Sequence, residues 1–394
     1  MEKQRKAVHN NKRKRRKRGV ERYFDYSLLF VTIFLLVFGL IMIYSASSYT
    51  AQMEEGNPAF YFNKQLLFTV IGLGAMFIMY LIDYRVWHKL APYIFFASLL
   101  LILALIPLGS SKNGATRWIR FGPIGVQPAD VSKAAVIIMV SSAVCSFGNK
   151  LKKFRFVLLI CAMTAGVTAL LIFVVSNNMS SALIILMIAV VMTFVAYPGY
   201  KIYVALTGAG VVAIAGIYAW IIKMINSGAT MTKFRLKRLL VWIKPENYAS
   251  DTGYQTIQAL YAIGSGGLFG KGLGKSMQKL GFIPESQNDM IFSIVCEELG
   301  LFGAVCIMLV FAIMLWRIAH IAQNAPDLFG TMIAVGVFAH IAIQVVLNIA
   351  VVTNFIPNTG VSLPFISYGG TSTVVLLAEI GAVLNISSKI RLER

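Results

Sequence analysis

The sequence predicts an all-α polytopic membrane protein of about ten transmembrane helices, with a large structured extracytoplasmic loop between the seventh and eighth spans. Two observations carry this prediction. The chain of 394 residues is 58% hydrophobic but only 13% charged, whereas a soluble domain carries about twice that share of charge. The apolar residues also form charge-free runs, such as Tyr26 to Met53 and Phe156 to Tyr200, instead of the alternating pattern of a β-barrel.

The positions of the spans follow from these runs, because a bilayer core needs about 20 apolar residues per helical crossing. The run from Phe156 to Tyr200 is long enough for two spans, separated by the polar hairpin at 176–181. Spans are expected at 26–47, 65–82, 90–109, 128–147, 156–175, 179–196, 202–222, 289–316, 328–352 and 367–387.

The N-terminal tail, residues 1–25, is strongly basic and is expected to be disordered and cytoplasmic. Its tract from Lys12 to Arg18 lies beside the first span, where contact with anionic lipids is favoured over binding of nucleic acid. The short inside loops of this topology carry more Lys and Arg than the short outside loops, and ten spans return the C-terminus to the cytoplasm. Residues 26–394 are expected to form a single membrane domain.

The outside loop, residues 223–288, contains two recognisable segments. Thr232–Ile243 mixes cations with apolar residues, as in a helix lying in the membrane interface or a solvated basic helix. Ala262–Gly274 is rich in glycine, which suits either a turn threading between helices or a close approach of backbone amides to an anion. Phe269 stands where a Walker A motif needs its first glycine, so a nucleotide site is excluded.

Ionisable residues at membrane depth are costly and are therefore candidates for function. Asp130 and Lys133 stand three residues apart at the start of the fourth span and can pair on one helix face, either to orient helices or to serve catalysis. Asp289 stands where the outside loop enters the eighth span. Partial desolvation there would raise its pKa toward that of a useful base, but aspartate is also a common N-cap residue and the position fits that role.

Several motifs together resemble those of one known family. The most specific is PNTGVSLPFISYGGTS at 357–372, just before the last span. The others, in matching order and spacing, are Asn113–Trp118 with Gln127-Pro128 and Lys133, Gly253-Tyr-Gln255, Ala262–Gly267, Pro284-Glu285 with Asp289, and Glu298-Leu-Gly300. They resemble the shape, elongation, division and sporulation (SEDS) family over essentially the whole chain after the tail, and they are closer to its FtsW and SpoVE branch than to its RodA branch.

The chain departs from the family pattern at three places. Asp130 stands where the family usually has glutamate, which preserves the charge but shortens its reach. The His-Thr pair that often precedes the aspartate is absent before Asp289. The segment 176–181 lacks the acidic turn of many members, so no role is carried over there.

The resemblance implies a peptidoglycan glycosyltransferase of septal or sporulation cell-wall synthesis, in the bacterial cytoplasmic membrane, which polymerises lipid II by inverting transfer. It implies Asp289 as general base. It also implies a class B penicillin-binding protein as partner, within the divisome or a related complex. The implied substrate-binding residues are Arg117, Lys133, Lys271, Lys275, Glu285, Ser367 and Tyr368.

A divalent cation, Mg or Mn, could share the charge of the diphosphate. The four cysteines and four histidines are scattered, so no metal-ligand set can be written from their spacing. The partner's transmembrane helix is expected against 338–347 and 373–384, because weakly polar faces of small residues suit helix packing in lipid.

Two other function classes stay open. A flippase for the same lipid would fit the burial of Asp130, Lys133 and Glu379, and a non-catalytic scaffold would only recruit and activate the penicillin-binding protein. Glycan polymer made in detergent micelles would exclude both as the sole activity, because a micelle has no two sides.

Overall fold

The computed structural model of the chain describes residues 23–391, except 113–114, 122–123, 200, 206–207, 211, 213–214, 217–218, 220–233 and 249–252. Within this described part, nine helices are long and apolar enough to cross a membrane. They correspond to all the predicted spans except 202–222, about half of which lies outside the described residues. The basic tract of the tail lies wholly outside them. The prediction of an all-helical polytopic membrane protein is confirmed.

The spans are built from the following helices. They are α2 (Tyr26–Glu55), α3 (Phe60–Leu81), α4 (Arg85–Leu103) with α5 (Leu105–Leu108), α6 (Pro128–Phe147) with η1 (Gly148–Lys152), α7 (Phe154–Cys161) with η2 (Ala162–Gly166) and α8 (Val167–Ser176), α9 (Met179–Ala196), α13 (Ile291–Asn324), α14 (Leu328–Val352) and α15 (Gly370–Ser387). The loop between α9 and α13 contributes α11 (Phe234–Ile243), η3 (Pro245–Tyr248) and α12 (Tyr254–Gly266).

Local polar groups set several helix ends. The Asp25 carboxylate accepts a hydrogen bond from the Leu28 amide at 2.9 Å, which caps α2, and it also pairs with Arg317 at 2.7 Å. Asn178 caps α9 in the same way through the Ser181 amide. Asn177, just before it, is left-handed (φ 54°), a conformation that asparagine tolerates. The polar hairpin predicted at 176–181 is therefore confirmed.

A small antiparallel sheet at 109–126 was not predicted. Its strands β1 (Gly109–Lys112), β2 (Ala115–Phe121) and β3 (Ile124–Val126) pair in chain order. Two of the three strands, β1 with four residues and β3 with three, are too short to show a recognisable alternation. The sheet leads into α6, where the Thr371 hydroxyl donates to the Gly125 carbonyl at 2.8 Å and accepts from the Gln127 amide at 3.2 Å. These bonds fix the sheet against the start of α15.

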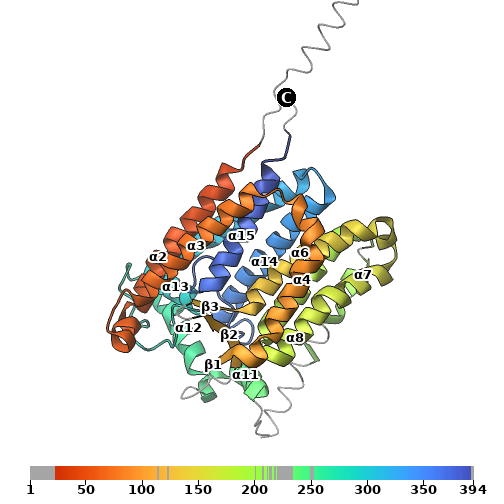
Figure 1. Cartoon of the computed structure of the whole chain (residues 1–394). Helices are drawn as coiled ribbons and strands as arrows, with labels where there is room; N and C mark the ends of the chain where they lie inside the picture. Colours follow the sequence, from red (N-terminus) through yellow and green to blue (C-terminus); the bar gives the residue numbers. More distant parts are fainter. Residues whose placement is uncertain are drawn as a thin grey trace, which may run out of the picture.

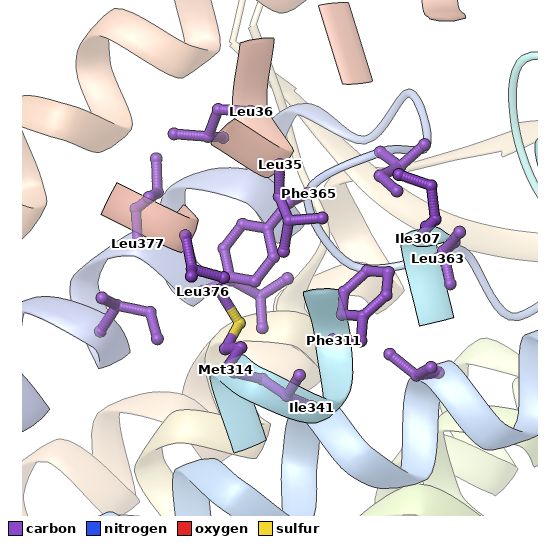
Figure 2. Close-up of a cluster of buried hydrophobic side chains, with 14 of the residues drawn as sticks. Leu35, Leu36, Ile307, Phe311, Met314, Ile341, Leu363, Phe365, Leu376 and Leu377 are labelled. Carbon is purple, nitrogen blue, oxygen red and sulfur yellow. The ribbon is translucent and has the colours of Figure 1, made fainter. Parts of the chain in front are cut away.

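The centre of the bundle is apolar and close-packed around α15. Figure 2 shows side chains from four helices and the loop before α15 converging there, namely Leu35, Leu36, Ile307, Phe311, Met314, Ile341, Leu363, Phe365, Leu376 and Leu377. Small residues permit close approach, since a Cβ on Gly381 would lie only 2.3 Å from the Met76 carbonyl oxygen of α3. The expectation that 373–384 offers a docking face was wrong, because α15 is the most buried of the nine spans and its small residues pack within the chain.

The two ends of the bundle differ. The sheet, α11 and α12 gather at one end, and the C-terminus lies at the other (Figure 1). The segment between α14 and α15 contacts α11, since Trp242 donates to the Asn354 carbonyl at 3.1 Å. The same segment is joined to the turn before α13 through Asn348, which donates to the Val361 and Asp289 carbonyls. The motifs of the sequence analysis are thereby brought to one end of the molecule.

Candidate functional site

Asp289 occupies the turn before α13 and does not cap that helix. The N-cap of α13 is Met290, and no side chain makes a capping hydrogen bond there. The capping interpretation of Asp289 was therefore wrong. The side chain is partly buried, and burial raises its pKa to about 6, with a further rise from the negative charge of Glu285 and an opposing effect from Arg238. A carboxylate that caps no helix and whose pKa lies near neutral pH is suited to proton transfer.

Asn348 of α14 fixes the backbone at Asp289. Its side-chain amide nitrogen donates to the Asp289 carbonyl and to the Val361 carbonyl, both at 2.7 Å, and the residue is fully buried. One amide group thus joins the turn before α13 to the segment before α15. Gly360 lies beside the carboxylate with φ +68°, and a Cβ there would lie 3.8 Å from Asp289 Oδ2. The sequence analysis missed Asn348, since nothing in its apolar helical context distinguishes it.

Two arginines from distant parts of the chain are electrostatically coupled at this site, and one of them, Arg238, also acts on Asp289. Arg238 of α11 is partly buried, and its Nη1 donates to the Asn358 carbonyl at 3.3 Å. Burial lowers the pKa of Arg238, and the charge of Asp289 opposes this effect. Burial also lowers the pKa of Arg117 of β2, with a further contribution from the charge of Arg238. The Arg117 Nε is buried with no hydrogen-bond partner among the described residues.

Arg238 was assigned only to an interfacial helix by the sequence analysis and not to the site. Its spacing beside leucines fits that helix equally well, so no sequence signal separates it from its neighbours. The contact with Asn358 shows the difference, because α11 packs on the segment before α15. Gln255 completes this arrangement, since its Oε1 accepts from Asn358 at 3.0 Å and its Nε2 donates to the Pro284 carbonyl at 3.3 Å.

The other predicted site residues lie in different settings. Glu285 is exposed, has φ +50° and accepts from the Asn288 side chain at 2.8 Å. Ser367 is buried and accepts from the Leu363 amide, and the Tyr368 amide donates to the Gln287 carbonyl at 2.9 Å. Ser367 thus folds the segment before α15, and Tyr368 joins it to the turn that carries Asp289.

Two of the three predicted substrate-binding lysines form ion pairs with carboxylates of the chain. Lys133 and Asp130 form the predicted ion pair at 2.9 Å, with both side chains buried. Lys271 pairs with the buried Glu297 at 2.7 Å, and Lys275 is exposed. The backbone amides of Lys271 and Gly272 donate to carbonyls of α13. The glycine-rich segment is therefore a turn packed between helices, as one of the two interpretations expected.

The described residues do not supply a cluster of three or more His, Cys, Asp or Glu side chains that could hold a metal ion. Among the described residues, Glu285 is the carboxylate whose charge acts on Asp289. Since Mg²⁺ is commonly held by one or two carboxylates together with substrate phosphates, a cation shared with the diphosphate stays a prediction.

Comparison with known proteins assigns the family. The family model described as "Cell cycle protein", which covers FtsW, RodA and SpoVE, matches residues 26–392. Stage V sporulation protein E of Bacillus subtilis (strain 168) is 39% identical over 369 residues, covering 92% of this chain and 96% of that protein. The probable peptidoglycan glycosyltransferase FtsW of the same organism is 35% identical over 369 residues, covering 92% and 90%.

Solved structures share the fold. One of them, "Structural coordination of polymerization and crosslinking by a peptidoglycan synthase complex", matches with a TM-score of 0.73 at 23% identity, covering 92% of this chain and 97% of that chain. The rod shape determining protein RodA of Thermus thermophilus matches with a TM-score of 0.63 at 23% identity, covering 94% and 98%. This chain belongs to the SEDS family of FtsW, RodA and SpoVE.

Proposed function

We propose that this protein polymerises lipid II by inverting glycosyl transfer, with Asp289 as general base. The class of activity follows from the family and its relatives: the chain is a peptidoglycan glycosyltransferase of cell division or sporulation. The observation that carries the mechanism is the setting of Asp289, a partly buried carboxylate with a pKa of about 6 that caps no helix. At neutral pH most of it is ionised and able to accept a proton.

The reaction joins two lipid-linked disaccharides. The 4-hydroxyl oxygen of a GlcNAc attacks the anomeric carbon of a MurNAc, and its proton passes to the Asp289 carboxylate. The bond between the anomeric carbon and the diphosphate oxygen breaks, and undecaprenyl diphosphate leaves with the electron pair. An α-linked donor becomes a β-1,4 bond, so a single in-line displacement is sufficient and no covalent enzyme intermediate is needed.

Arg117 and Arg238 are proposed to meet the diphosphate. Burial lowers the pKa of both arginines, and the charge of Arg238 adds to this effect at Arg117, so a bound anion would stabilise their charges. The Arg117 Nε is buried and makes no hydrogen bond to any described residue. Arginine is well suited to phosphate oxygens because its planar fork can donate two bonds at once. Charge that develops on the leaving group would then be stabilised by groups already in place.

The cellular setting is proposed by analogy and charge. The multi-pass chain would lie in the bacterial cytoplasmic membrane with both termini in the cytoplasm, and the end that carries Asp289 would face outward, where the sugar of lipid II is presented. A class B penicillin-binding protein would be its partner within the divisome or a related complex. A solved structure of the same fold comes from a peptidoglycan synthase complex, which supports such a setting.

The decisive experiment uses purified protein and labelled lipid II in detergent micelles. The unaltered protein should form glycan polymer, which a flippase or a scaffold alone cannot do. Asp289→Asn keeps the side-chain shape but cannot accept a proton, and loss of a general base costs about 10²–10⁴-fold in rate. If Asp289→Asn polymerised lipid II at a near-normal rate, the base would have to be sought elsewhere, first at Glu285.

A further inference from the structure

Helix α13 is broken at Gly300, and the glycine-rich segment 262–274 packs against the break. Gly300 has φ 69° and ψ −171°, which is not helical. The amides of Leu301 and Phe302 donate to the carbonyls of Gly267 and Leu268, at 2.9 and 3.0 Å. The break therefore leaves these four backbone groups hydrogen-bonded, as irregular backbone at membrane depth requires.

The same break is bonded on its other side. The amides of Lys271 and Gly272 donate to the Glu297 and Glu298 carbonyls, both at 2.9 Å. A Cβ on Gly300 would lie 2.3 Å from the Gly270 nitrogen. The backbones of α13 and of the glycine-rich segment therefore approach too closely for any residue but glycine at position 300. These bonds attach the start of the segment that leads to Asp289 to a fixed position along α13, at Glu297 and Glu298.

Two adjacent carboxylates lie buried at this joint, and lysines from the attached segment neutralise both. Glu297 and Glu298 have no exposed surface. Lys271 Nζ lies 2.7 Å from Glu297 Oε1, and Lys279 Nζ lies 3.0 Å from Glu298 Oε1. The Ser276 hydroxyl and the Met277 amide also donate to Glu297. We call Glu297, Glu298, Lys271, Lys279 and Ser276 the lysine–glutamate cluster.

The cluster also reaches the first span. Ser45 of α2 donates to Glu298 at 2.7 Å and accepts from Lys279 at 3.0 Å. At the next residue of α2, the Ala46 carbonyl accepts from the Ser286 hydroxyl at 3.0 Å. The stretch from 271 to 288 is therefore held to α13 at one end and to α2 along its length, and Asp289 follows it directly.

We propose that Glu297 and Glu298 are positioning residues for Asp289, and that Lys271 acts by neutralising Glu297 and not by binding the substrate diphosphate. The proposal rests on the proposed function, because it assumes that Asp289 is the base. In this proposal the positive charge of Lys271 neutralises Glu297, in place of the substrate binding that the sequence analysis expected. A buried carboxylate that loses its cation is strongly destabilising. Removing the lysine or the glutamate of one pair should therefore disturb the structure of the lysine–glutamate cluster.

The test is a double-mutant cycle read by kcat and KM for lipid II polymerisation in micelles. Lys271→Met alone leaves Glu297 buried without its cation, and the attached segment should shift. Misplacement by about 1 Å costs about 10²-fold in rate, so kcat should fall by one to two orders of magnitude, on the order of that cost, while KM changes little. Lys271→Met with Glu297→Gln removes both charges and should recover much of the lost kcat.

Lys275 provides the matched control. It lies in the same segment and is exposed, and no ion pair of Lys275 is found in the described part of the chain. Lys275→Met removes the same charge. Adding Glu297→Gln to Lys275→Met should not raise kcat, because Lys275 does not pair with Glu297. Lys271→Arg, which keeps the charge, should retain most of the kcat of the unaltered protein.

Three outcomes would overturn the proposal. The first is a raised KM with unchanged kcat in Lys271→Met. The second is a kcat of the double variant no higher than that of Lys271→Met, and the third is an equal rise in kcat when Glu297→Gln is added to Lys275→Met. If Lys271→Met does not fold, the charge inversion Lys279→Glu with Glu298→Lys is compared with each single change, and absence of mutual rescue counts against the cluster. Asp289→Asn, measured in parallel, separates the two ideas: full activity there defeats the proposed function, whatever the cycle shows.

Discussion

The carboxyl group of Asp289 lies between an acidic and a basic neighbour, and burial is the main reason that its pKa rises to about 6. As a base it must be ionised, so kcat/KM should fall tenfold per pH unit below about 6 and level off above it. A pH–rate profile of lipid II polymerisation checks this. A rate unchanged between roughly pH 5 and 7 would show that no group of this pKa limits the reaction.

The raised pKa also has a consequence for stability. A carboxyl group whose pKa is higher in the folded state contributes stability that is present below its unfolded pKa and is lost as pH rises through the folded value. At pH 7.5 the ionised Asp289 is therefore a cost to the folded protein. Asp289→Asn should lose activity while its melting temperature stays equal or rises, and a large drop in melting temperature would point to a structural role.

Arg238 offers an independent check on the same carboxylate. Its charge lowers the pKa of Asp289, so Arg238→Gln should move the acid limb of the pH–rate profile to higher pH, in addition to weakening the reaction. Lys244→Gln is the matched control, because Lys244 is an exposed cation just after the same helix. An acid limb that stays in place in Arg238→Gln, or moves equally in both variants, would argue against proximity of Arg238 and Asp289.

Helix α6 begins with a buried ion pair, in which Lys133 and Asp130 lie 2.9 Å apart. Breaking a buried pair by removing one partner costs about 3–5 kcal/mol, because the other charge is left uncompensated. Lys133→Ala and Asp130→Ala should each lower the melting temperature in detergent, and the double variant should be less damaged than either. Strictly additive losses in folded yield would show that the two charges are not coupled.

The glycine-rich segment and the break in α13 show how one element depends on another. In the sequence, 289–316 looks like a continuous span because its residues are apolar and helix-forming. The break at Gly300 is stable because amides and carbonyls of 267–272 replace the lost helical hydrogen bonds. A helix interrupted in this way can hold charged side chains near the membrane boundary without exposing its own backbone.

The molecule as a whole presents its candidate site at the end opposite the C-terminus (Figure 1). In the proposed topology, which puts the C-terminus in the cytoplasm, this end of the molecule would face outward. A reporter inserted in 223–288 should therefore be active only outside the cytoplasm, and one fused after Arg394 only inside it. A cytoplasmic signal from 223–288 would remove the argument for a lipid II site at this end.

Composition and short-range spacing were enough for the membrane class, nine of the ten spans, the hairpin at 176–181 and the Asp130–Lys133 pair. These features depend on local quantities: the apolar length of a helix and the geometry of residues three or four apart. The hypothesis that Asp289 is the base came from the family resemblance and stays a prediction, whereas the alternative that Asp289 caps α13 was wrong. A cap depends on where the helix begins, and α13 begins two residues later than Asp289.

The membership of Arg238 in the site came only from packing. Arg117, Arg238 and Asp289 come from three separate parts of the chain, and the charge of Arg238 acts on both Arg117 and Asp289. The resemblance implied Lys271 as a substrate-binding residue, and only the structure shows that Glu297, 26 residues away in the sequence, lies 2.7 Å from it. Ion-pair partners that are far apart in the chain show no regular spacing in the sequence. They are determined by how whole helices pack and by the free-energy cost of leaving a buried charge unpaired.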